Sequence, residues 1–197
     1  MQIKTILDTL SGYQPVVLPD TPQTAAVMVI LLDNGINDLE IVLTERSRQL
    51  PTYAGDYSFP GGMSDSTDSD LYTTATREVQ EELNITSAAY QRIAQLDDFM
   101  DRYGHLVRPF VTHMNKPDFE KNLKISPDEI TQIFYFSLSK LDQIKDNPQL
   151  HHITKRRPSY SYAQGNVFVW GLTAAILVHL SNIIYNKNQA LGKLLTR

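Results

Sequence analysis

The sequence contains no cysteine. This absence excludes a disulfide framework, a thiolate zinc site and a cysteine nucleophile. The five histidines do not show the spacing of a zinc site, so zinc bound through histidine alone is unsupported as well.

The chain also lacks an excess of positive charge and an apolar run long enough for a membrane. Its net charge is −4 at pH 7, which argues against broad electrostatic attraction to nucleic acid. The most apolar stretch, about residues 168–185, is interrupted by Gly171 and His179, so its uninterrupted part is too short to span a bilayer. We therefore expect neither a nucleic-acid partner nor a membrane partner.

No targeting segment is recognisable in the sequence. A basic segment followed by an apolar run does not occur near the N-terminus, so no secretory signal is expected. The residues Leu195-Thr196-Arg197 do not form a peroxisomal Ser-Lys-Leu signal. The default expectation is a cytoplasmic protein.

The composition is that of an ordinary globular domain. Hydrophobic residues make up 42% and charged residues 20% of the chain. A length of 197 residues suits one domain with a proper core. We expect residues 1–22 to form an N-terminal helix and connector, and residues 23–197 to form the main domain, with no internal repeat.

Hydrophobic patterning predicts a short amphipathic helix over residues 1–10, followed by an extended connector. The connector, residues 13–22, contains three prolines, which neither a helix nor a central strand tolerates. Residues 25–32 are continuously apolar and predict a strand buried on both faces. A turn at Asn34-Gly35 leads to a second strand over residues 39–44.

The second half of the chain predicts three more strands and a final helix. Residues 106–113 form a strand that Pro109 interrupts, which predicts an edge or a bulge at that residue. Asp97, Asp98 and Asp101 fall in an expected loop, where exposed turn residues are the commoner explanation and a metal site is the alternative. The other elements are strands over residues 93–99 and 130–138 and a helix over about residues 168–185.

Three glutamates lie close together on one predicted helix. Residues 73–83 contain neither glycine nor proline, so Glu78 and Glu82 share one helical face with Glu81 beside them. Like charges at this spacing repel and require a positive partner. Carboxylate oxygens suit a hard divalent cation such as Mg²⁺. The alternative is a solvated acidic face, as in most charged helices.

The residues around this helix resemble the Nudix box. Gly62, five residues, Asp68, eight residues and then Arg77-Glu78-Val79-Gln80-Glu81-Glu82-Leu83-Asn84-Ile85 follow G-x5-E-x7-R-E-U-x-E-E-x-G-U, where U is aliphatic. Asn84 replaces a glycine that ends the helix in a left-handed conformation, which asparagine also tolerates. Asp68 and the extra residue after it are similar to the coenzyme A diphosphatase-like subgroup.

A second motif supports the same subgroup. Its pattern, L-L-T-x-R-S-x3-R-x3-G-x3-F-P-G-G, is matched by Val42-Leu43-Thr44-Glu45-Arg46-Ser47, Gly55 and Phe59-Pro60-Gly61-Gly62 at the expected spacing. Pro51 stands where the motif has arginine. If that arginine contacts a phosphate of coenzyme A, its absence leaves other diphosphate substrates open.

The resemblance implies an α/β protein with the Nudix fold, an α/β/α sandwich around a mixed β-sheet. It implies metal-dependent hydrolysis of a diphosphate linkage, with coenzyme A or acyl-coenzyme A giving 3′,5′-ADP and (acyl-)4′-phosphopantetheine. ADP-ribose or a dinucleotide is the alternative substrate, and a non-catalytic nucleotide-binding module is a further alternative. The implied cofactor is Mg²⁺ or Mn²⁺, the implied partner is a small-molecule nucleotide, and a homodimer is possible.

The resemblance also implies roles for particular residues. Metal ligands are expected from Glu78, Glu82 and Glu81 and from the backbone of Gly61 or Gly62. Catalytic roles are expected for Glu81, Arg77 and Glu129, with the general base either a helix glutamate or Glu129. Substrate contacts are expected from Arg46, Arg48, Gly61 and Phe59. Asp68 is expected to face Arg77 and orient it, with Asp65 at most supporting the site.

Some of these residues have a simpler explanation. Arg46 and Arg48 could serve surface solubility, and Glu129 could cap a turn. Trp170 is expected to pack in the core, with stacking on an adenine as the alternative. Lys155-Arg156-Arg157 could bind a substrate phosphate but more simply forms a solvated loop, and the adjacent His151-His152 make a poor metal pair.

Overall fold

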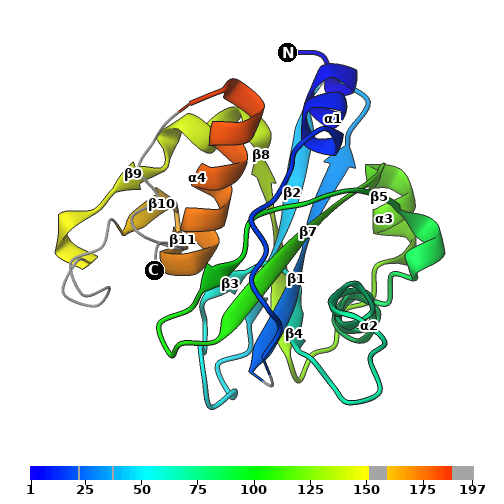
Figure 1. The fold of residues 1–197 in the computed structure, drawn as a ribbon, viewed down its shortest axis with the longest axis vertical. Coiled ribbons are helices and arrows are strands. Elements are labelled where there is room, and N and C mark those ends of the chain that lie inside the picture. Colours follow the sequence, from blue (N-terminus) through cyan, green and yellow to red (C-terminus); the bar gives the residue numbers. More distant parts are fainter. Residues whose placement is uncertain (22, 37, 151–158, 188–197) are drawn as a thin grey trace.

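The computed structural model describes residues 1–21, 23–36, 38–150 and 159–187. It shows a mixed β-sheet with helices on both faces (Figure 1). Helices α1 and α4 cover one face, and α2 and α3 cover the other. The predicted α/β/α sandwich is therefore confirmed.

The described part of the chain forms four helices, eight strands in the large sheet and three strands in a small sheet. The helices are α1 (Ile3–Ser11), α2 (Leu71–Leu83), α3 (Lys116–Asn122) and α4 (Gly171–Tyr185). The large sheet contains β1 (Thr24–Asp33), β2 (Leu39–Arg46), β3 (Tyr57–Ser58), β4 (Gly61–Met63), β5 (Gln91–Gln95), β6 (Phe99–Met100), β7 (Leu106–Asn115) and β8 (Ile130–Ser137). The small sheet contains β9 (Lys145–Asp146), β10 (Tyr160–Gln164) and β11 (Val167–Trp170).

Strand β1 lies at the centre of the large sheet, as its continuous apolar run predicts. It pairs in parallel with β7 along its whole length. On its other edge it pairs with β4 near its start and with β2 near its end. Met28 and Ile30 pack toward α2, whereas Val29 and Leu31 pack toward α1 and α4. Both faces of β1 are buried because helices cover both sides of the sheet.

The sequence predicted an edge or a bulge at Pro109. The edge is wrong, because β7 is paired on both sides, but the neighbouring strand is irregular at this place. Pro109 lies opposite the break between β5 and β6, where the Leu96 N–H donates to its carbonyl at 2.9 Å. The N and C=O of one residue in a strand point to the same side. The proline nitrogen therefore faces the break in the neighbouring strand, where no ladder hydrogen bond is lost.

Two other boundaries differ from the sequence prediction. Residues 168–170 belong to β11, so the last helix begins only at Gly171. The strand expected over residues 93–99 is divided into β5 and β6. Helix α3 and the small β9–β11 sheet were not predicted, because these short segments show little hydrophobic periodicity.

The N-terminal connector is attached to the sheet by a buried ion pair. Asp98 is fully buried and accepts two hydrogen bonds from Arg108, at 2.8 Å each. Arg108 also donates to the Leu18 carbonyl, and the Leu18 N–H donates back to Asp98. The prediction that Asp98 is an exposed turn residue was therefore wrong.

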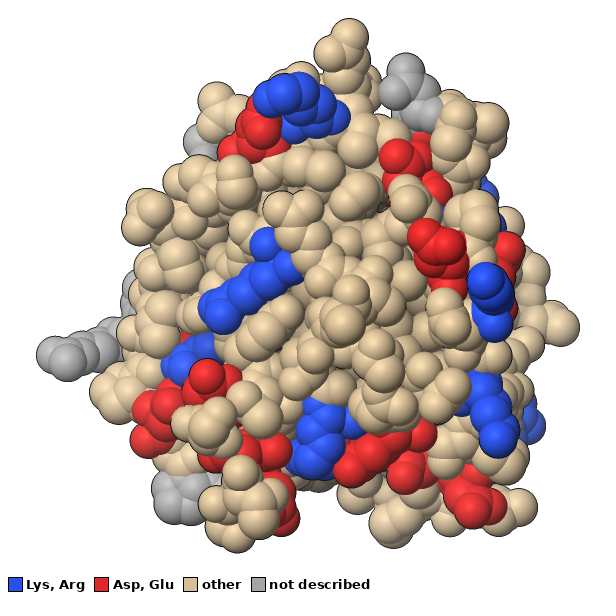
Figure 2. All heavy atoms as spheres, turned by 90° about the vertical axis from the view of Figure 1, so that its right-hand side faces the viewer, with Lys and Arg blue, Asp and Glu red and all other residues tan. Residues whose placement is uncertain are grey.

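Charged side chains are dispersed on the side covered by α2 and α3. Figure 2 shows that blue and red residues lie there in small separate groups. Among the described helices, none has the length and hydrophobicity that a bilayer-spanning helix needs.

We predict that Asp98→Ala lowers the free energy of unfolding by about 3–5 kcal/mol, because Arg108 would remain buried without its bidentate partner. Urea unfolding of the purified variant measures this. Asp20→Ala is the matched control, since Asp20 also bonds Arg108 but its side chain is 62% exposed, and its cost should stay below about 1 kcal/mol. Equal costs for the two variants would contradict the prediction.

Candidate functional site

Helix α2 begins and ends at residues that its sequence marks clearly. The Asp70 side chain accepts a hydrogen bond from the Thr73 N–H at 2.7 Å and caps the N-terminus. Asn84 closes the helix in the left-handed conformation, with φ 60° and ψ 26°. The predicted helix and the predicted conformation of Asn84 are both confirmed. The glutamates are therefore held on the last two turns of a well-capped helix.

Arg77 joins the helix to the segments before it. Its Nη1 donates to Glu78 Oε1 at 2.8 Å and to Glu81 Oε2 at 2.9 Å. Its Nη2 donates to the Met63 carbonyl of β4 at 3.1 Å. One guanidinium thus contacts two glutamates, reduces the repulsion between them and attaches β4 to α2. The positive partner that the glutamates were expected to need is Arg77.

Asp68 faces Arg77, as predicted. Its two carboxylate oxygens accept hydrogen bonds from Arg77 Nε and Nη2, both at 3.1 Å. It also accepts from the Asp65 N–H and the Thr74 hydroxyl. The hydrogen bonds from Arg77 lower the pKa of Asp68 to about 2. Asp68 is therefore ionised at neutral pH and fixes the orientation of the guanidinium.

The Gly61-Gly62 pair forms strand β4 and not a free turn. Gly61 has φ +147°, and a Cβ there would come within 2.3 Å of the Ala26 carbonyl oxygen. A Cβ at Gly62 would come within 2.6 Å of Glu78 Oε1. Both glycines are required by close approach, the first to β1 and the second to the Glu78 carboxylate. The backbone of β4 thus lies directly against one of the predicted metal ligands.

Glu82 is the most unusual acid in the described chain. Its residue exposure is only 2%, and its Oε2 has no hydrogen-bond partner. Burial raises its pKa to about 8, and the neighbouring charges of Glu78 and Glu129 act in the same direction. Arg46 and the Gly61 N–H oppose this rise. A buried carboxylate with an unpartnered oxygen is one that a cation would satisfy.

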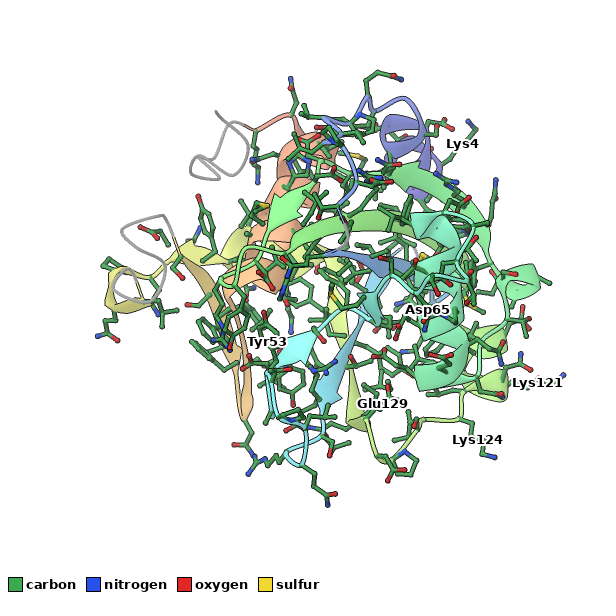
Figure 3. All side chains as sticks on the ribbon, turned by 60° about the horizontal axis from the view of Figure 1, so that its bottom comes forward. Lys4, Tyr53, Asp65, Lys121, Lys124 and Glu129 are labelled. Carbon is green, nitrogen blue, oxygen red and sulfur yellow. The ribbon has the colours of Figure 1, made fainter. Side chains whose placement is uncertain are left out.

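Arg46 and Glu129 reach the same place from outside the helix. Arg46 ends β2 opposite Ile130, so the residue before Ile130, Glu129, is brought next to it. The Ser126 N–H donates to the Glu82 carbonyl at 2.9 Å and holds this turn against the end of α2. Arg46 Nε is buried without a hydrogen bond, which does not fit the alternative of a simple surface arginine. Figure 3 labels Glu129 beside the strands at this end of the molecule.

Burial of Glu78 has the same effect on acidity as burial of Glu82. It raises the pKa of Glu78, whereas the charge of Arg77 lowers it. The Glu81 side chain is 52% exposed and lies on the solvent side of Arg77. The three glutamates thus occupy three environments: Glu82 buried, Glu78 mostly covered by β4 and Arg77, and Glu81 open to solvent.

Other predicted residues lie farther from this centre. Phe59 is 3% exposed and packs in the core, so its side chain supports the β3–β4 segment and offers no surface for a ligand. Arg48 is exposed in the loop after β2. The predicted roles for His151-His152 and Lys155-Arg156-Arg157 lie outside the described residues.

The residues at this centre fit a divalent cation. Hard cations prefer several oxygen ligands, and Glu82 Oε2 and the Glu78 carboxylate against β4 supply them. Within the described residues, no three acidic or histidine side chains already form a metal-binding group. Glu78 and Glu81 are instead held by Arg77.

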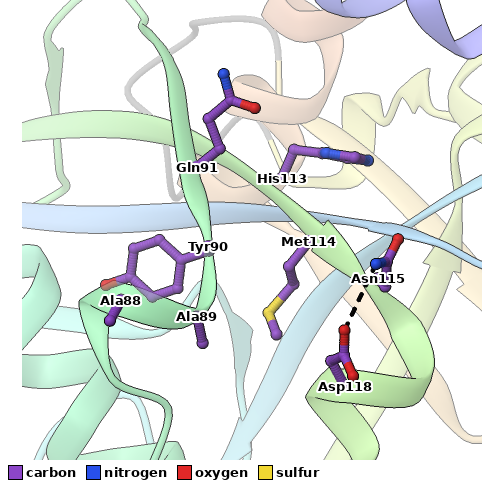
Figure 4. A pocket seen from close by; sticks show the side chains of 8 residues that line it. All are labelled: Ala88, Ala89, Tyr90, Gln91, His113, Met114, Asn115 and Asp118. Atoms are coloured by element: carbon purple, nitrogen blue, oxygen red, sulfur yellow. Dashed lines mark hydrogen bonds between the residues drawn. The ribbon is translucent and has the colours of Figure 1, made fainter.

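The two clearest surface pockets of the described chain lie elsewhere. One, of about 370 Å³, lies beside the end of β7 and is shown in Figure 4. The other, of about 610 Å³, lies between α1 and α4 and contains His179. No predicted site residue lines either pocket. The candidate site is therefore defined by its acidic residues and the β4 backbone.

Comparison with known proteins gives a consistent result. The NUDIX domain family matches residues 22–157. Mitochondrial coenzyme A diphosphatase NUDT8 of Mus musculus is 32% identical over 163 residues, covering 81% of this chain and 77% of that protein. The crystal structure of a C. elegans Ap4A hydrolase binary complex has a TM-score of 0.51 at 21% identity, covering 68% of this chain and 94% of that one.

Plant relatives are longer than this chain. Nudix hydrolase 15, mitochondrial, of Arabidopsis thaliana is 28% identical over 182 residues, covering 86% of this chain and 61% of that protein. Nudix hydrolase 22, chloroplastic, of the same plant is 28% identical over 188 residues, covering 91% of this chain and 62% of that protein. The chain thus spans about three fifths of the length of these two relatives.

We predict that the buried carboxyl of Glu82 makes the metal-free protein less stable as the pH rises. The pKa of Glu82 is about 8 in the folded protein and 4.5 as its ordinary value. The protonated carboxyl therefore contributes its full stabilisation below about pH 4.5, and this stabilisation is lost as the pH rises from 4.5 to about 8. Glu82→Gln removes this titrating group. The free energy of unfolding should then lose a slope of up to about 1.4 kcal/mol per pH unit, so that its plot against pH becomes flatter. Urea unfolding with EDTA at pH 5, 6, 7 and 8 measures it.

Glu81→Gln is the matched control, since it removes the same charge from an exposed position on the same helix. Its pH dependence should remain that of the wild type. A Glu82→Gln curve as steep as the wild-type curve would contradict the prediction.

Proposed function

The chain belongs to the Nudix family, and on this premise we propose that it hydrolyses a diphosphate linkage in a nucleotide derivative. The substrate that we propose is coenzyme A or acyl-coenzyme A, and the products are 3′,5′-ADP and (acyl-)4′-phosphopantetheine. The mouse relative NUDT8 is named a coenzyme A diphosphatase, which supports this choice. The motif around Arg46 and the insertion after Asp68 support the same subgroup.

The observation that carries the proposal is the buried, unpartnered oxygen of Glu82, whose carboxyl group accepts a hydrogen bond from the Gly61 backbone. A purely structural acid in this position would be paired, because an unpaired buried polar group is costly. The family's box glutamates are all present, which argues against a module that binds nucleotides without hydrolysis. That alternative is therefore placed last.

The proposed metal ligands are Glu78, Glu82 and, on the exposed side, Glu81, with a backbone carbonyl from Gly61 or Gly62. A bound Mg²⁺ or Mn²⁺ supplies charge neutralisation at the diphosphate, which lowers the electrostatic barrier to an anionic nucleophile. The oxygen-only donor set is the one that these hard cations prefer.

The other residues act through hydrogen bonds and charge. Arg77 holds Glu78 and Glu81 in place and is itself held by Asp68. Glu129 or a helix glutamate takes the proton from the attacking water. Arg46 faces the same centre and is suited to contact a phosphate oxygen, since guanidinium groups bind phosphate bidentately. Arg48, on the exposed loop, is the weaker candidate for such a contact.

ADP-ribose or a dinucleotide is the second candidate substrate. The observation that favours it is Pro51, which stands in the exposed loop after β2 where the subgroup motif has arginine. The catalytic centre would serve either class of substrate, because both contain a diphosphate between two larger groups. The difference between them lies in the contacts outside that centre.

Several further properties follow as proposals. Residues 1–22 form an N-terminal helix and connector on a Nudix hydrolase domain of residues 23–197, and α1 packs into the same core as α4. The cytoplasmic location and the possible homodimer remain predictions. The names of the plant and mouse relatives place those proteins in mitochondria or chloroplasts.

We predict that the purified protein with Mg²⁺ cleaves coenzyme A or an acyl-coenzyme A at the diphosphate. A panel that also contains ADP-ribose, NADH and dinucleoside polyphosphates, read by product mass, measures the preference. Cleavage of ADP-ribose or NADH in preference to coenzyme A would select the second candidate. No cleavage of any member at saturating Mg²⁺ or Mn²⁺ would refute hydrolysis.

We further predict that Glu82→Gln lowers turnover at least about 100-fold, because a ligand that positions a catalytic cation contributes several kcal/mol to the barrier. Its folded state should be retained, since glutamine has the same shape and no charge to bury. Circular dichroism and steady-state kinetics test the two parts. Wild-type activity at saturating Mg²⁺ would contradict the prediction.

A further inference from the structure

Arg102 lies over three aromatic rings from separate parts of the chain. Its guanidinium carbon is 4.7 Å from the ring centroid of Tyr53, 5.0 Å from that of Tyr103 and 5.6 Å from that of Trp170. Tyr53 and Tyr103 pack edge to face. We call these four residues the Arg102 cluster. Each ring restricts the guanidinium through cation–π contact, so its position is fixed without an ion pair.

Arg102 differs from the structural arginines of this chain in its lack of hydrogen bonds. Arg77 and Arg108 each donate several hydrogen bonds to carboxylates and carbonyls. Within the described residues, Arg102 makes no hydrogen bond and no ion pair, and it is exposed. An oriented guanidinium with free N–H groups is suited to receive an anion from solution.

The loop that carries Arg102 has a defined shape. Asp101 accepts hydrogen bonds from the N–H groups of Tyr103 and His105, both at 2.8 Å, and from the Tyr53 hydroxyl at 2.8 Å. Tyr53 itself has φ +56°, an uncommon conformation for a tyrosine. The Asp101 carboxylate thus joins the loop after β6 to the loop after β2.

The two ends of the loop after β2 meet at Arg46, which lies next to Glu82 of the acidic centre. The Arg46 N–H donates to the Asp56 carbonyl at 3.0 Å, and the Gly55 N–H donates to the Arg46 carbonyl at 3.0 Å. Trp170 Nε1 donates to the Asp56 side chain at 3.2 Å. Arg46 faces Glu82, and Trp170 faces Arg102. Figure 3 brings this end of the molecule forward and labels both Tyr53 and Glu129 on it.

The placement of Arg102 also bears on the missing motif arginine. Pro51 occupies the motif position, and Tyr53, two residues later in the same loop, is the ring under Arg102. The guanidinium of Arg102, from the loop after β6, thus lies over the loop after β2, in which Pro51 replaces the motif arginine. The chain keeps a guanidinium in this region, although it comes from a different part of the sequence.

We propose that Arg102 binds a phosphate monoester on the ribose of the nucleotide and thereby selects 3′-phosphorylated substrates. The proposal deepens the proposed function and depends on it for the diphosphate substrate, but not for the binding contact itself. The guanidinium would bind the monoester bidentately through its free N–H groups. The rings hold it so that little side-chain freedom is lost on binding.

The test uses the intrinsic fluorescence of Trp170, the single tryptophan of the chain. The full-length protein is titrated with 3′,5′-ADP and, separately, with 5′-AMP, which lacks the second phosphate. We expect the wild type to bind 3′,5′-ADP at least about tenfold more tightly than 5′-AMP, as for a charge-assisted contact. Arg102→Gln should reduce this preference to less than about twofold, and Arg102→Lys should retain part of it.

Arg92→Gln is the matched control. Arg92 also stacks on two rings, those of Tyr72 and Phe110, but it lies on β5 at the other end of β7. This variant should keep the wild-type preference. The thermal unfolding of all variants is measured in parallel, so that a loss of fold is not mistaken for a loss of binding.

Three results would overturn the proposal. In the first, the wild type does not distinguish the two nucleotides. In the second, Arg102→Gln keeps the full preference. In the third, Arg102→Gln weakens the binding of both nucleotides equally, which would indicate that Arg102 stacks on the base.

Kinetics separate this proposal from the proposed function. Two pairs of substrates differ by one phosphate on a ribose. The first is coenzyme A and 3′-dephospho-coenzyme A, and the second is NADPH and NADH. For coenzyme A, Arg102→Gln should raise KM at least about tenfold with kcat nearly unchanged, and the dephosphorylated substrate should be unaffected. An equal rise for both members would overturn the proposal. A protein that prefers 3′,5′-ADP but cleaves no diphosphate would refute the hydrolytic function and leave the Arg102 contact standing.

Discussion

The bonds of Arg77 are the interactions on which the candidate site depends. One guanidinium contacts Asp68 before the helix, Glu78 and Glu81 on it, and the Met63 carbonyl at the end of β4. Without this cation, the acids would repel one another on one side of α2. With it, their repulsion is reduced, and the β4 backbone is held against the helix. The cost of placing acids close together is thus offset locally, before any cation or substrate binds.

The central strand explains how the remaining residues meet. Strand β1 pairs with β4 near its start, which positions both glycines, and with the first residues of β2 near its end, which fixes β2 in the sheet. Strand β8 pairs with β2 with Ile130 opposite Arg46, so Glu129, the residue before β8, lies next to Arg46. The acidic centre therefore combines one helix with three strands of one sheet.

The sequence predicted the local parts of this arrangement and missed the distant ones. The resemblance to the Nudix box implied the Asp68–Arg77 pair and the left-handed Asn84, whereas the sequence pattern itself predicted the helix and the strand over β1. The burial of Asp98 depends on Arg108 from the next strand, and no local pattern shows it. Pro109 seemed to require an edge because the break in the neighbouring strand is visible only in the folded sheet. The Arg102 cluster joins two loops and the end of β11, and a single sequence contains no signal for such a meeting.

Glu82 shows how one burial can serve both folding and chemistry. A carboxylate that is 2% exposed cannot be a simple solubility residue, and its raised pKa means that the metal-free fold favours the protonated form. A cation reverses this preference, because it stabilises the ionised form and releases the proton. The strength of cation binding is therefore reduced by the cost of deprotonation near neutral pH and rises as the pH increases. The same burial that keeps water from Glu82 makes its charge state depend on whether a cation is bound.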